Sequence, residues 1–133
     1  MGVEILKVDH LGIRVVDSAR AEAFYAKLGF TVTARHEAAN VVILRNEHGV
    51  EINLSVNGDP ALDGSNILQD VPEKYAGYTH VALRVGSLAS AIAELDAAGI
   101  ALSDGPVTLG DGVSLFVRDP DRNVVELRAS DRS

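Results

Sequence analysis

An internal repeat at an offset of 70 residues limits the folds open to this chain more than any other feature of its sequence. Residues 10–29 read HLGIRVVDSARAEAFYAKLG, and residues 80–99 read HVALRVGSLASAIAELDAAG. Alanine matches are expected by chance in so alanine-rich a stretch, so the repeat depends on a histidine, an arginine and a glycine: His10/His80, Arg14/Arg84 and Gly29/Gly99. Two copies of one unit predict two similar modules.

Both copies change their hydrophobic spacing at the same point. Before Asp17 and Ser87 the apolar residues alternate with polar ones, which is typical of a half-buried strand. After these residues the spacing becomes helical. Asp17 and Ser87 suit helix N-caps, and Gly29 and Gly99 suit the left-handed position just past a helix. Each half therefore predicts a strand followed by a helix of about three turns.

Three more strands are expected after each helix, separated by turn-forming residues. They are predicted near residues 30–36, 40–46, 50–56, 101–109, 112–118 and 123–129. The order βαβββ, given twice, indicates an α+β fold in one domain over residues 1–133. Module one takes residues 1–57 and module two takes residues 78–133, joined by a loop over 58–77. A loop of that length is usually functional or disordered, so it is a candidate cover for a site.

Composition excludes several classes of function. The chain has no cysteine, which excludes disulfides, thiolate metal sites and cysteine nucleophiles. Its net charge of −7 disfavours nucleic acid as a partner. No apolar run approaches the roughly 18 residues that a membrane span needs, and no signal peptide is recognised. A cytoplasmic protein with a small-molecule substrate is therefore expected.

Polar side chains gather on strand faces that a hydrophobic core would reject. Strand alternation places eight of them there: His10, Arg14, Glu51, Asn53, His80, Arg84, Glu126 and Arg128. Each half contributes one imidazole on its first strand and one carboxylate on its last. Two imidazoles and two carboxylates are a ligand set that Zn²⁺, Ni²⁺, Fe²⁺ or Mn²⁺ accepts. The alternative is a solvated face of an antiparallel sheet.

The remaining aromatic, histidine and acidic residues are assigned no chemistry. The aromatic residues of the first module are expected to pack in the core: Phe24, Tyr25 and Phe30. His36 and His48 lie among polar residues and are expected at the surface. Asp119 and Asp121 are expected to stabilise a turn.

Four stretches resemble the vicinal oxygen chelate superfamily, which contains glyoxalases, bleomycin-resistance proteins, fosfomycin-resistance transferases and extradiol dioxygenases. They read VDHLGIRVVD…FYAKLGF, GVEINL, YTHVALRV…ELDAAGI and LFVRDPDRNVVEL, and together they cover nearly the whole chain. The resemblance implies two βαβββ modules in a curved, incomplete eight-strand barrel, usually as a homodimer. It also implies one divalent metal held by four residues: His10, Glu51, His80 and Glu126. A shift of two residues would put Asn53 in the place of Glu51.

The resemblance further implies a mechanism. Members of this superfamily chelate a substrate or intermediate through two adjacent oxygens. In lactoylglutathione lyases a carboxylate moves a proton through an enediolate of a hemithioacetal, an α-oxo substrate that contains glutathione. The matching residues here are Glu126 as the base and Glu51 as the second carboxylate. Arg14 matches an arginine that binds the glutathione carboxylate, and Asn53 and Arg84 are expected to contact substrate on the same faces.

Two differences from the lyases concern glutathione and leave the ligands unchanged. The lyases carry an asparagine four residues after the second ligand, where this chain has Ser55 and, two positions later, Asn57. The connecting loop is also longer, so another thiol could take the place of glutathione. Two other functions stay open: a metal-free bleomycin-resistance-type binding protein, and an extradiol-type dioxygenase with iron on two histidines and one carboxylate.

Overall fold

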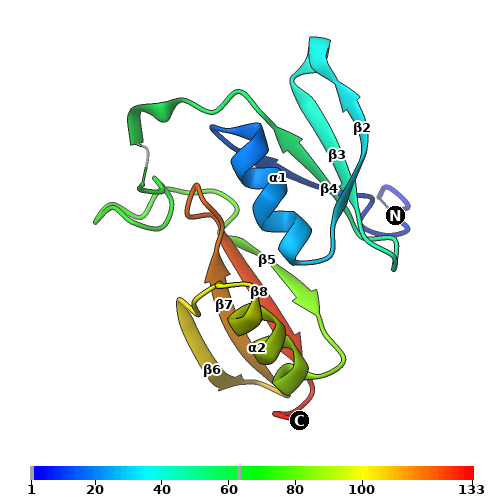
Figure 1. Cartoon of the computed structure of the whole chain (residues 1–133), viewed down its shortest axis with the longest axis vertical. Coiled ribbons are helices and arrows are strands. Elements are labelled where there is room, and N and C mark those ends of the chain that lie inside the picture. The colour runs from blue at the N-terminus through cyan, green and yellow to red at the C-terminus, as the bar shows by residue number, and fades with distance from the viewer. Residues whose placement is uncertain (1, 63) are drawn as a thin grey trace.

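Two modules of identical element order make up the chain, for which a computed structural model describes residues 2–62 and 64–133 (Figure 1). Module one contains β1 (Leu11–Arg14), α1 (Ser18–Lys27), β2 (Thr31–His36), β3 (Val41–Arg45) and β4 (Glu51–Ser55). Module two contains β5 (His80–Arg84), α2 (Leu88–Ala97), β6 (Asp104–Leu109), β7 (Gly112–Arg118) and β8 (Val124–Ala129). The predicted α+β order, βαβββ twice, is confirmed.

Each module forms its own four-stranded sheet, in the orders β1-β4-β3-β2 and β5-β8-β7-β6. The first strand pairs in parallel with the last, and the other pairs are antiparallel. Within the described residues both sheets are open, and β1 and β5 each leave one edge unpaired. The apolar faces of both sheets and both helices share one core, which includes Tyr25, Leu54, Leu95 and Leu127. No helix among the described residues is long and apolar enough to cross a membrane.

The helix boundaries lie where the caps were predicted. The side chains of Asp17 and Ser87 each accept a hydrogen bond from the amide three residues later, at 3.0 and 3.1 Å. Gly29 and Gly99 have φ angles of +95° and +75°, which side-chain-bearing residues rarely adopt. In both modules the residue after this glycine donates its amide hydrogen back into the last turn of the helix. The same local chemistry therefore ends both helices.

The turn between β7 and β8 joins the two modules. The Asp119 carboxylate is buried there and accepts hydrogen bonds from the Tyr25 hydroxyl of α1 at 2.9 Å and from the Asn123 amide at 2.8 Å. Asp121 Oδ1 accepts from the Val16 amide at 3.2 Å and pairs with Arg20 at 3.2 Å. Both aspartates therefore stabilise a turn, as predicted, and they also hold that turn against module one.

The connecting segment docks on the same turn. It contains one short 3₁₀ helix at Pro60–Leu62. Its Asp70 forms ion pairs with Arg118 at 3.2 Å and with Arg122 at 2.9 Å. Asn66 Nδ2 donates to Asn123 Oδ1 at 3.0 Å. The segment therefore covers the junction of the modules.

Replacing Tyr25 with phenylalanine is expected to lower the unfolding free energy by about 2 kcal/mol near neutral pH, because the variant loses a hydrogen bond to a buried carboxylate. Burial raises the pKa of Asp119, while hydrogen bonds from Asn123 and Tyr25 oppose the rise. Without the hydroxyl, the pKa in the folded state rises further, so the variant loses more stability as the pH climbs through that value.

The loss is therefore expected to be larger at about pH 7 than at about pH 4, because acid favours the protonated form of Asp119, which depends less on a hydrogen-bond donor. Urea unfolding at both pH values measures it. Tyr75→Phe at an exposed tyrosine is the matched control. An equal loss of stability at the two pH values would contradict the role given to Asp119.

Candidate metal-binding site

The first of two histidine–glutamate pairs lies in module two. His80 begins β5, Glu126 lies in β8, and strand pairing sets Glu126 opposite Ala82. His80 Nε2 lies 3.0 Å from Glu126 Oε1. Two donors bound at right angles to one ion, each at about 2.1 Å, are themselves about 3 Å apart. The two atoms therefore already have the spacing of neighbouring ligands of a metal ion.

Glu126 is held in place from beneath by a buried serine. Ser114 Oγ on β7 donates to Glu126 Oε2 at 2.6 Å and accepts from Arg128 Nη1 at 3.0 Å. Ser114 is fully buried, and Glu126 is 7% exposed. One carboxylate oxygen is thus fixed by the protein while the other faces His80. Ser114 was not among the predicted site residues, although its position two residues before Phe116 puts it on the same face.

The His80 ring is oriented by its neighbours. Thr79 Oγ1 and His80 Nδ1 share a hydrogen bond of 2.8 Å. The ring also meets the Phe116 ring edge to face, with centroids 6.1 Å apart. With Nδ1 engaged by Thr79, Nε2 is the nitrogen left for a metal, and a hydrogen bond on the other ring nitrogen is the usual support for a histidine ligand.

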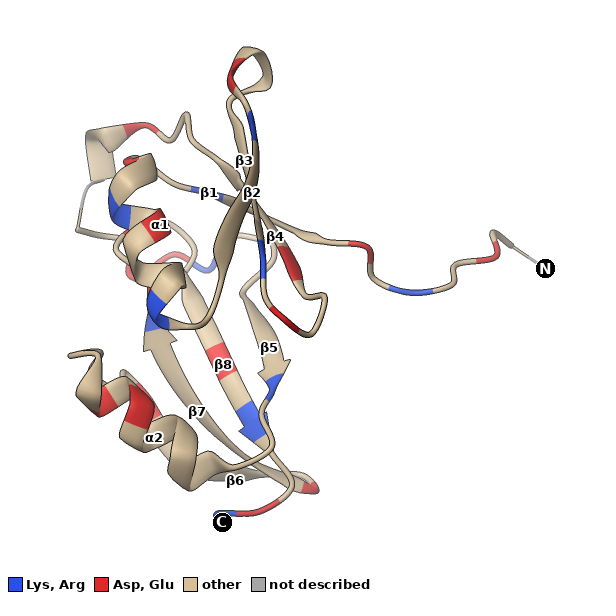
Figure 2. Ribbon diagram, turned by 45° about the vertical axis from the view of Figure 1, so that its right-hand side comes forward, with Lys and Arg blue, Asp and Glu red and all other residues tan. Residues whose placement is uncertain are grey.

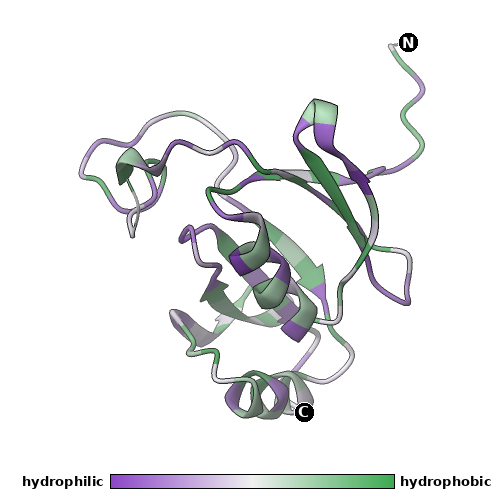
Figure 3. Cartoon of the chain, turned by 45° about the horizontal axis from the view of Figure 1, so that its top comes forward, coloured by the Kyte–Doolittle hydropathy of each residue, from purple (hydrophilic) through white to green (hydrophobic). Residues whose placement is uncertain are grey.

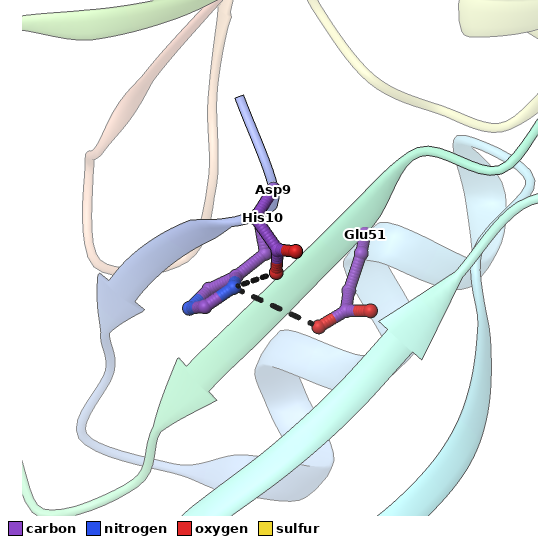
Figure 4. A group of neighbouring side chains, drawn as sticks. All are labelled: Asp9, His10 and Glu51. Carbon is purple, nitrogen blue, oxygen red and sulfur yellow. Dashed lines mark hydrogen bonds and ion pairs between the residues drawn. The ribbon is translucent and has the colours of Figure 1, made fainter. Parts of the chain in front are cut away.

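The second pair lies in module one (Figure 4). His10 Nδ1 is 4.0 Å from Glu51 Oε2 and 2.7 Å from Asp9 Oδ1. These three residues each offer a ligand atom within 4.8 Å of the others. The hydrogen bond with His10 holds the pKa of Asp9 below its usual value. Asp9 was not among the predicted ligands, because it precedes β1 and strand alternation does not assign it to a face.

Glu51 is already paired with a cation. Arg45 lies directly opposite it on β3, and its Nε and Nη2 atoms reach Glu51 Oε1 at 2.9 and 2.7 Å. Glu126 has Phe116 opposite it instead. A guanidinium on one oxygen of a carboxylate partly neutralises its charge and so weakens its attraction for a metal ion, even though Oε2 is the oxygen nearer His10. The two carboxylates therefore have different electrostatic surroundings.

By strand register, Asn53 occupies in module one the position that Glu126 occupies in module two. Gly12 and Ala82 are equivalent in the repeat, and their strand partners are Asn53 and Glu126 respectively. Asn53 Oδ1 is buried and has no hydrogen-bond partner among the described residues. A buried acceptor without a partner is costly, which is evidence of a missing ligand. The amide of Asn53 is therefore a second candidate donor beside Glu51.

The structure shows the surroundings of the arginines that are predicted to contact substrate. Arg14 Nε donates to Asn57 Oδ1 at 3.2 Å. Asn57 stands four residues after Asn53, which is the spacing that the lyases show after their second ligand. Arg84 is exposed, at the end of β5. The contact of Arg14, Asn53 and Arg84 with a substrate remains a prediction.

The structure does not bring the two pairs together. Among residues 2–62 and 64–133, no cluster of histidine and acidic side chains joins His10 to His80. Hollows of about 610 and 450 Å³ are lined by residues outside both pairs. The side chains of His10 and His80 are 43% and 37% exposed. In a single chain each pair therefore lies on an open strand face. His36 and His48 are exposed, as predicted.

Comparison with known proteins identifies the family of the chain. Residues 7–127 match the family model described as Glyoxalase/Bleomycin resistance protein/Dioxygenase superfamily. The uncharacterized protein YwkD of Bacillus subtilis (strain 168) is 33% identical over 130 residues, covering 90% of this chain and 94% of YwkD.

Solved structures share the fold. A glyoxalase/dioxygenase from Nostoc punctiforme superposes with a TM-score of 0.71 at 21% identity, over 98% of this chain and 99% of that one. TnmS3, an antibiotic binding protein from Streptomyces sp. CB03234, superposes with a TM-score of 0.70 at 23% identity, over 97% and 99% of the two chains. One fold thus serves proteins described both as enzymes and as binders.

Proposed function

The chain belongs to the glyoxalase/bleomycin resistance protein/dioxygenase superfamily, and on that premise we propose that it is a divalent-metal enzyme that isomerises a small α-oxo substrate, in the manner of a lactoylglutathione lyase. The observation that carries the proposal is the pair His80 and Glu126, with donor atoms 3.0 Å apart. An ordinary ion pair at the surface does not need a buried donor that fixes its carboxylate. The fully buried Ser114 beneath Glu126 fits a working carboxylate better.

The residues present fit a divalent ion. His10, His80 and Glu126 would supply two imidazoles and a carboxylate, a set suited to Zn²⁺, Ni²⁺, Fe²⁺ or Mn²⁺. The resemblance names Glu51 as the fourth ligand. Arg45 on Glu51 and the unpaired Oδ1 of Asn53 favour Asn53 for that position instead. Glu51 then serves to neutralise Arg45 at the rim of the site.

The complete site is proposed to form between two copies of the chain. His10 from module one and His80 from module two each stand on an open face, next to the unpaired edge of β1 or β5. Exposed strand edges are usually paired or covered in natural proteins. A homodimer that brings β1 of one copy beside β5 of the other would cover both edges and join the two pairs.

The chain's own residues can carry out the proton transfer. A bound divalent ion would act as a Lewis acid that polarises two adjacent oxygens of the substrate. Glu126 then removes the proton from the carbon beside the carbonyl and returns it to the neighbouring carbon. Ser114 holds Oε2, so Oε1 would be the oxygen that leaves a bound ion when the substrate enters and then moves the proton. Arg14, steadied by Asn57, would bind a carboxylate of glutathione or another thiol co-substrate.

Two measurements test this function. Elemental analysis of protein purified without added metal is expected to find about one divalent ion per chain. The metal-loaded protein, given the hemithioacetal of methylglyoxal and glutathione in D₂O, is expected to exchange or transfer the substrate proton. Metal without turnover would overturn the lyase assignment alone. No metal at all, with tight binding of a large ligand, would favour a binder comparable to the antibiotic binding protein TnmS3.

The pairing of Glu51 with Arg45 favours a second candidate, an extradiol-type dioxygenase. If Glu51 stays on Arg45 and Asn53 does not bind the ion, the site offers two histidines and one carboxylate, the ligand set of non-haem iron oxygenases. Oxygen uptake by the iron-loaded protein with a catechol distinguishes this candidate from the isomerase. Oxygen uptake without proton exchange on the hemithioacetal would support it.

Ser114→Ala is expected to reduce turnover about tenfold and to weaken metal binding by a similar factor, because a group that supports a ligand is lost. Ser114 is a positioning residue, so the pH profile of the rate is expected to shift as well. Ser90→Ala, at an exposed serine of α2, is the matched control. Unchanged metal affinity together with an unchanged pH profile would contradict this role.

A further inference from the structure

The segment before β1 exposes several large apolar side chains that do not belong to the hydrophobic core. Residues 3–8, here called the arm, run extended and away from the sheets (Figures 2 and 3). The large apolar side chains of the arm are 75–86% exposed: Val3, Ile5, Leu6 and Val8. Among the described residues, nothing forms a hydrogen bond with the arm. Four clustered exposed hydrophobic residues indicate an interaction surface.

The repeat gives the arm a counterpart. At the offset of 70, residues 4–9 correspond to 74–79, and Val8 corresponds to Tyr78. Tyr78 is 97% exposed and Tyr75 is 56% exposed. Each segment leads directly into the strand that begins at or just after a site histidine, at the open edge of its sheet. The molecule therefore carries two exposed apolar segments beside its two unpaired edges.

We propose that the arm of one copy packs on residues 74–79 of a second copy, and that this contact closes the site formed between them. The proposal rests on the proposed function, which requires the same two edges to meet. The arm is continuous with β1, so a parallel alignment of β1 with β5 of the second copy that places His10 beside His80 also places the arm beside residues 74–79. Six extended residues span about 20 Å, enough to follow the whole of residues 74–79.

A dimer with twofold symmetry would cover the exposed apolar segments of both copies at once. Each copy offers one arm and one 74–79 segment, so two reciprocal contacts bury both arms and both tyrosine-bearing segments. A lipid surface is the less suitable partner, because membrane-binding segments depend on basic residues. The arm contains one glutamate and one lysine, Glu4 and Lys7, in a chain of net charge −7.

The first test compares dimer affinity by sedimentation. Ile5→Ser/Leu6→Ser in the full chain is expected to raise the dimer dissociation constant about 100-fold. The control Leu62→Ser/Ile67→Ser, at two exposed apolar residues of the connecting segment, is expected to leave it unchanged. A wild-type dimer with the same affinity as the arm variant overturns this inference and leaves the proposed function standing. A monomeric wild-type chain overturns both the inference and the shared site.

The second test begins with the wild-type chain, so its first measurement does not depend on how a variant folds. Amide hydrogen exchange at residues 3–8 is expected to slow on dimerisation. Mixing Leu6→Cys chains with Tyr78→Cys chains is expected to give a disulfide between copies, since the chain has no other cysteine. Leu6→Cys mixed with Glu47→Cys, in the exposed turn before β4, is the control. An arm that exchanges freely in the dimer, or no Leu6–Tyr78 cross-link, overturns the docking proposed here.

Discussion

Replacing His80 with alanine is expected to reduce the bound metal from about one ion per chain to nearly none. Changes to groups that merely support a ligand cost about 10–100-fold in affinity, so loss of a ligand itself is expected to cost more than about 100-fold. The substitution removes the Nε2 atom 3.0 Å from Glu126 Oε1 and leaves that oxygen without its imidazole partner. Activity that depends on the metal is expected to disappear with it.

Elemental analysis and competitive titration of the His80→Ala protein measure this effect. His48→Ala is the matched control, because His48 is an exposed histidine in the turn before β4. Circular dichroism is used to check that both variants are folded. Full metal content in the His80→Ala protein would remove the main ligand assignment, and with it the proposed chemistry.

Replacing Glu126 with glutamine is expected to separate metal binding from catalysis. The amide oxygen can still contact the ion, so metal affinity is expected to fall only about tenfold. The amide cannot accept the substrate proton, so proton exchange at the substrate carbon is expected to fall about 10³-fold. The site geometry predicts this division, because Ser114 holds one oxygen and leaves the other for the proton.

Nuclear magnetic resonance in D₂O follows the exchange directly with an accepted substrate. Glu94→Gln, at an exposed glutamate of α2, serves as the matched control. Exchange at the wild-type rate in the Glu126→Gln protein would assign the base to another residue while leaving the metal site intact. Loss of both metal and exchange would show that Glu126 acts mainly as a ligand.

Local features of the sequence predicted most of the fold. The change from alternating to helical spacing at Asp17 and Ser87 lies within one residue of both helix starts. The glycines that end the helices were recognisable because a left-handed backbone favours glycine. Alternation in β4 and β8 assigned the correct side chains to the buried faces. These features depend on residues that are close in sequence.

The details of the candidate site depend on distant residues and could not be predicted in the same way. Alternation shows that Glu51 and Asn53 share a face, but only the pairing of β1 with β4 shows which of them corresponds to Glu126. The pairing of Arg45 with Glu51 is likewise a matter of cross-strand register.

Buried polar contacts escaped prediction for a related reason. A serine or an aspartate in a strand or turn is ordinary in a sequence. Ser114 gains importance only from the carboxylate above it, and Asp119 only from Tyr25, 94 residues away. Burial of a polar group is decided by tertiary packing, which a local pattern does not record.

A mixed dimer tests whether each site combines His10 of one copy with His80 of the other. His10→Ala and His80→Ala chains with different affinity tags are combined, and the mixed dimer is isolated and loaded with metal. One of its two sites then lacks both histidines, and the other keeps both. About one ion is expected per mixed dimer, and none in either variant alone. A mixed dimer without metal, beside a fully loaded wild-type dimer, would contradict it.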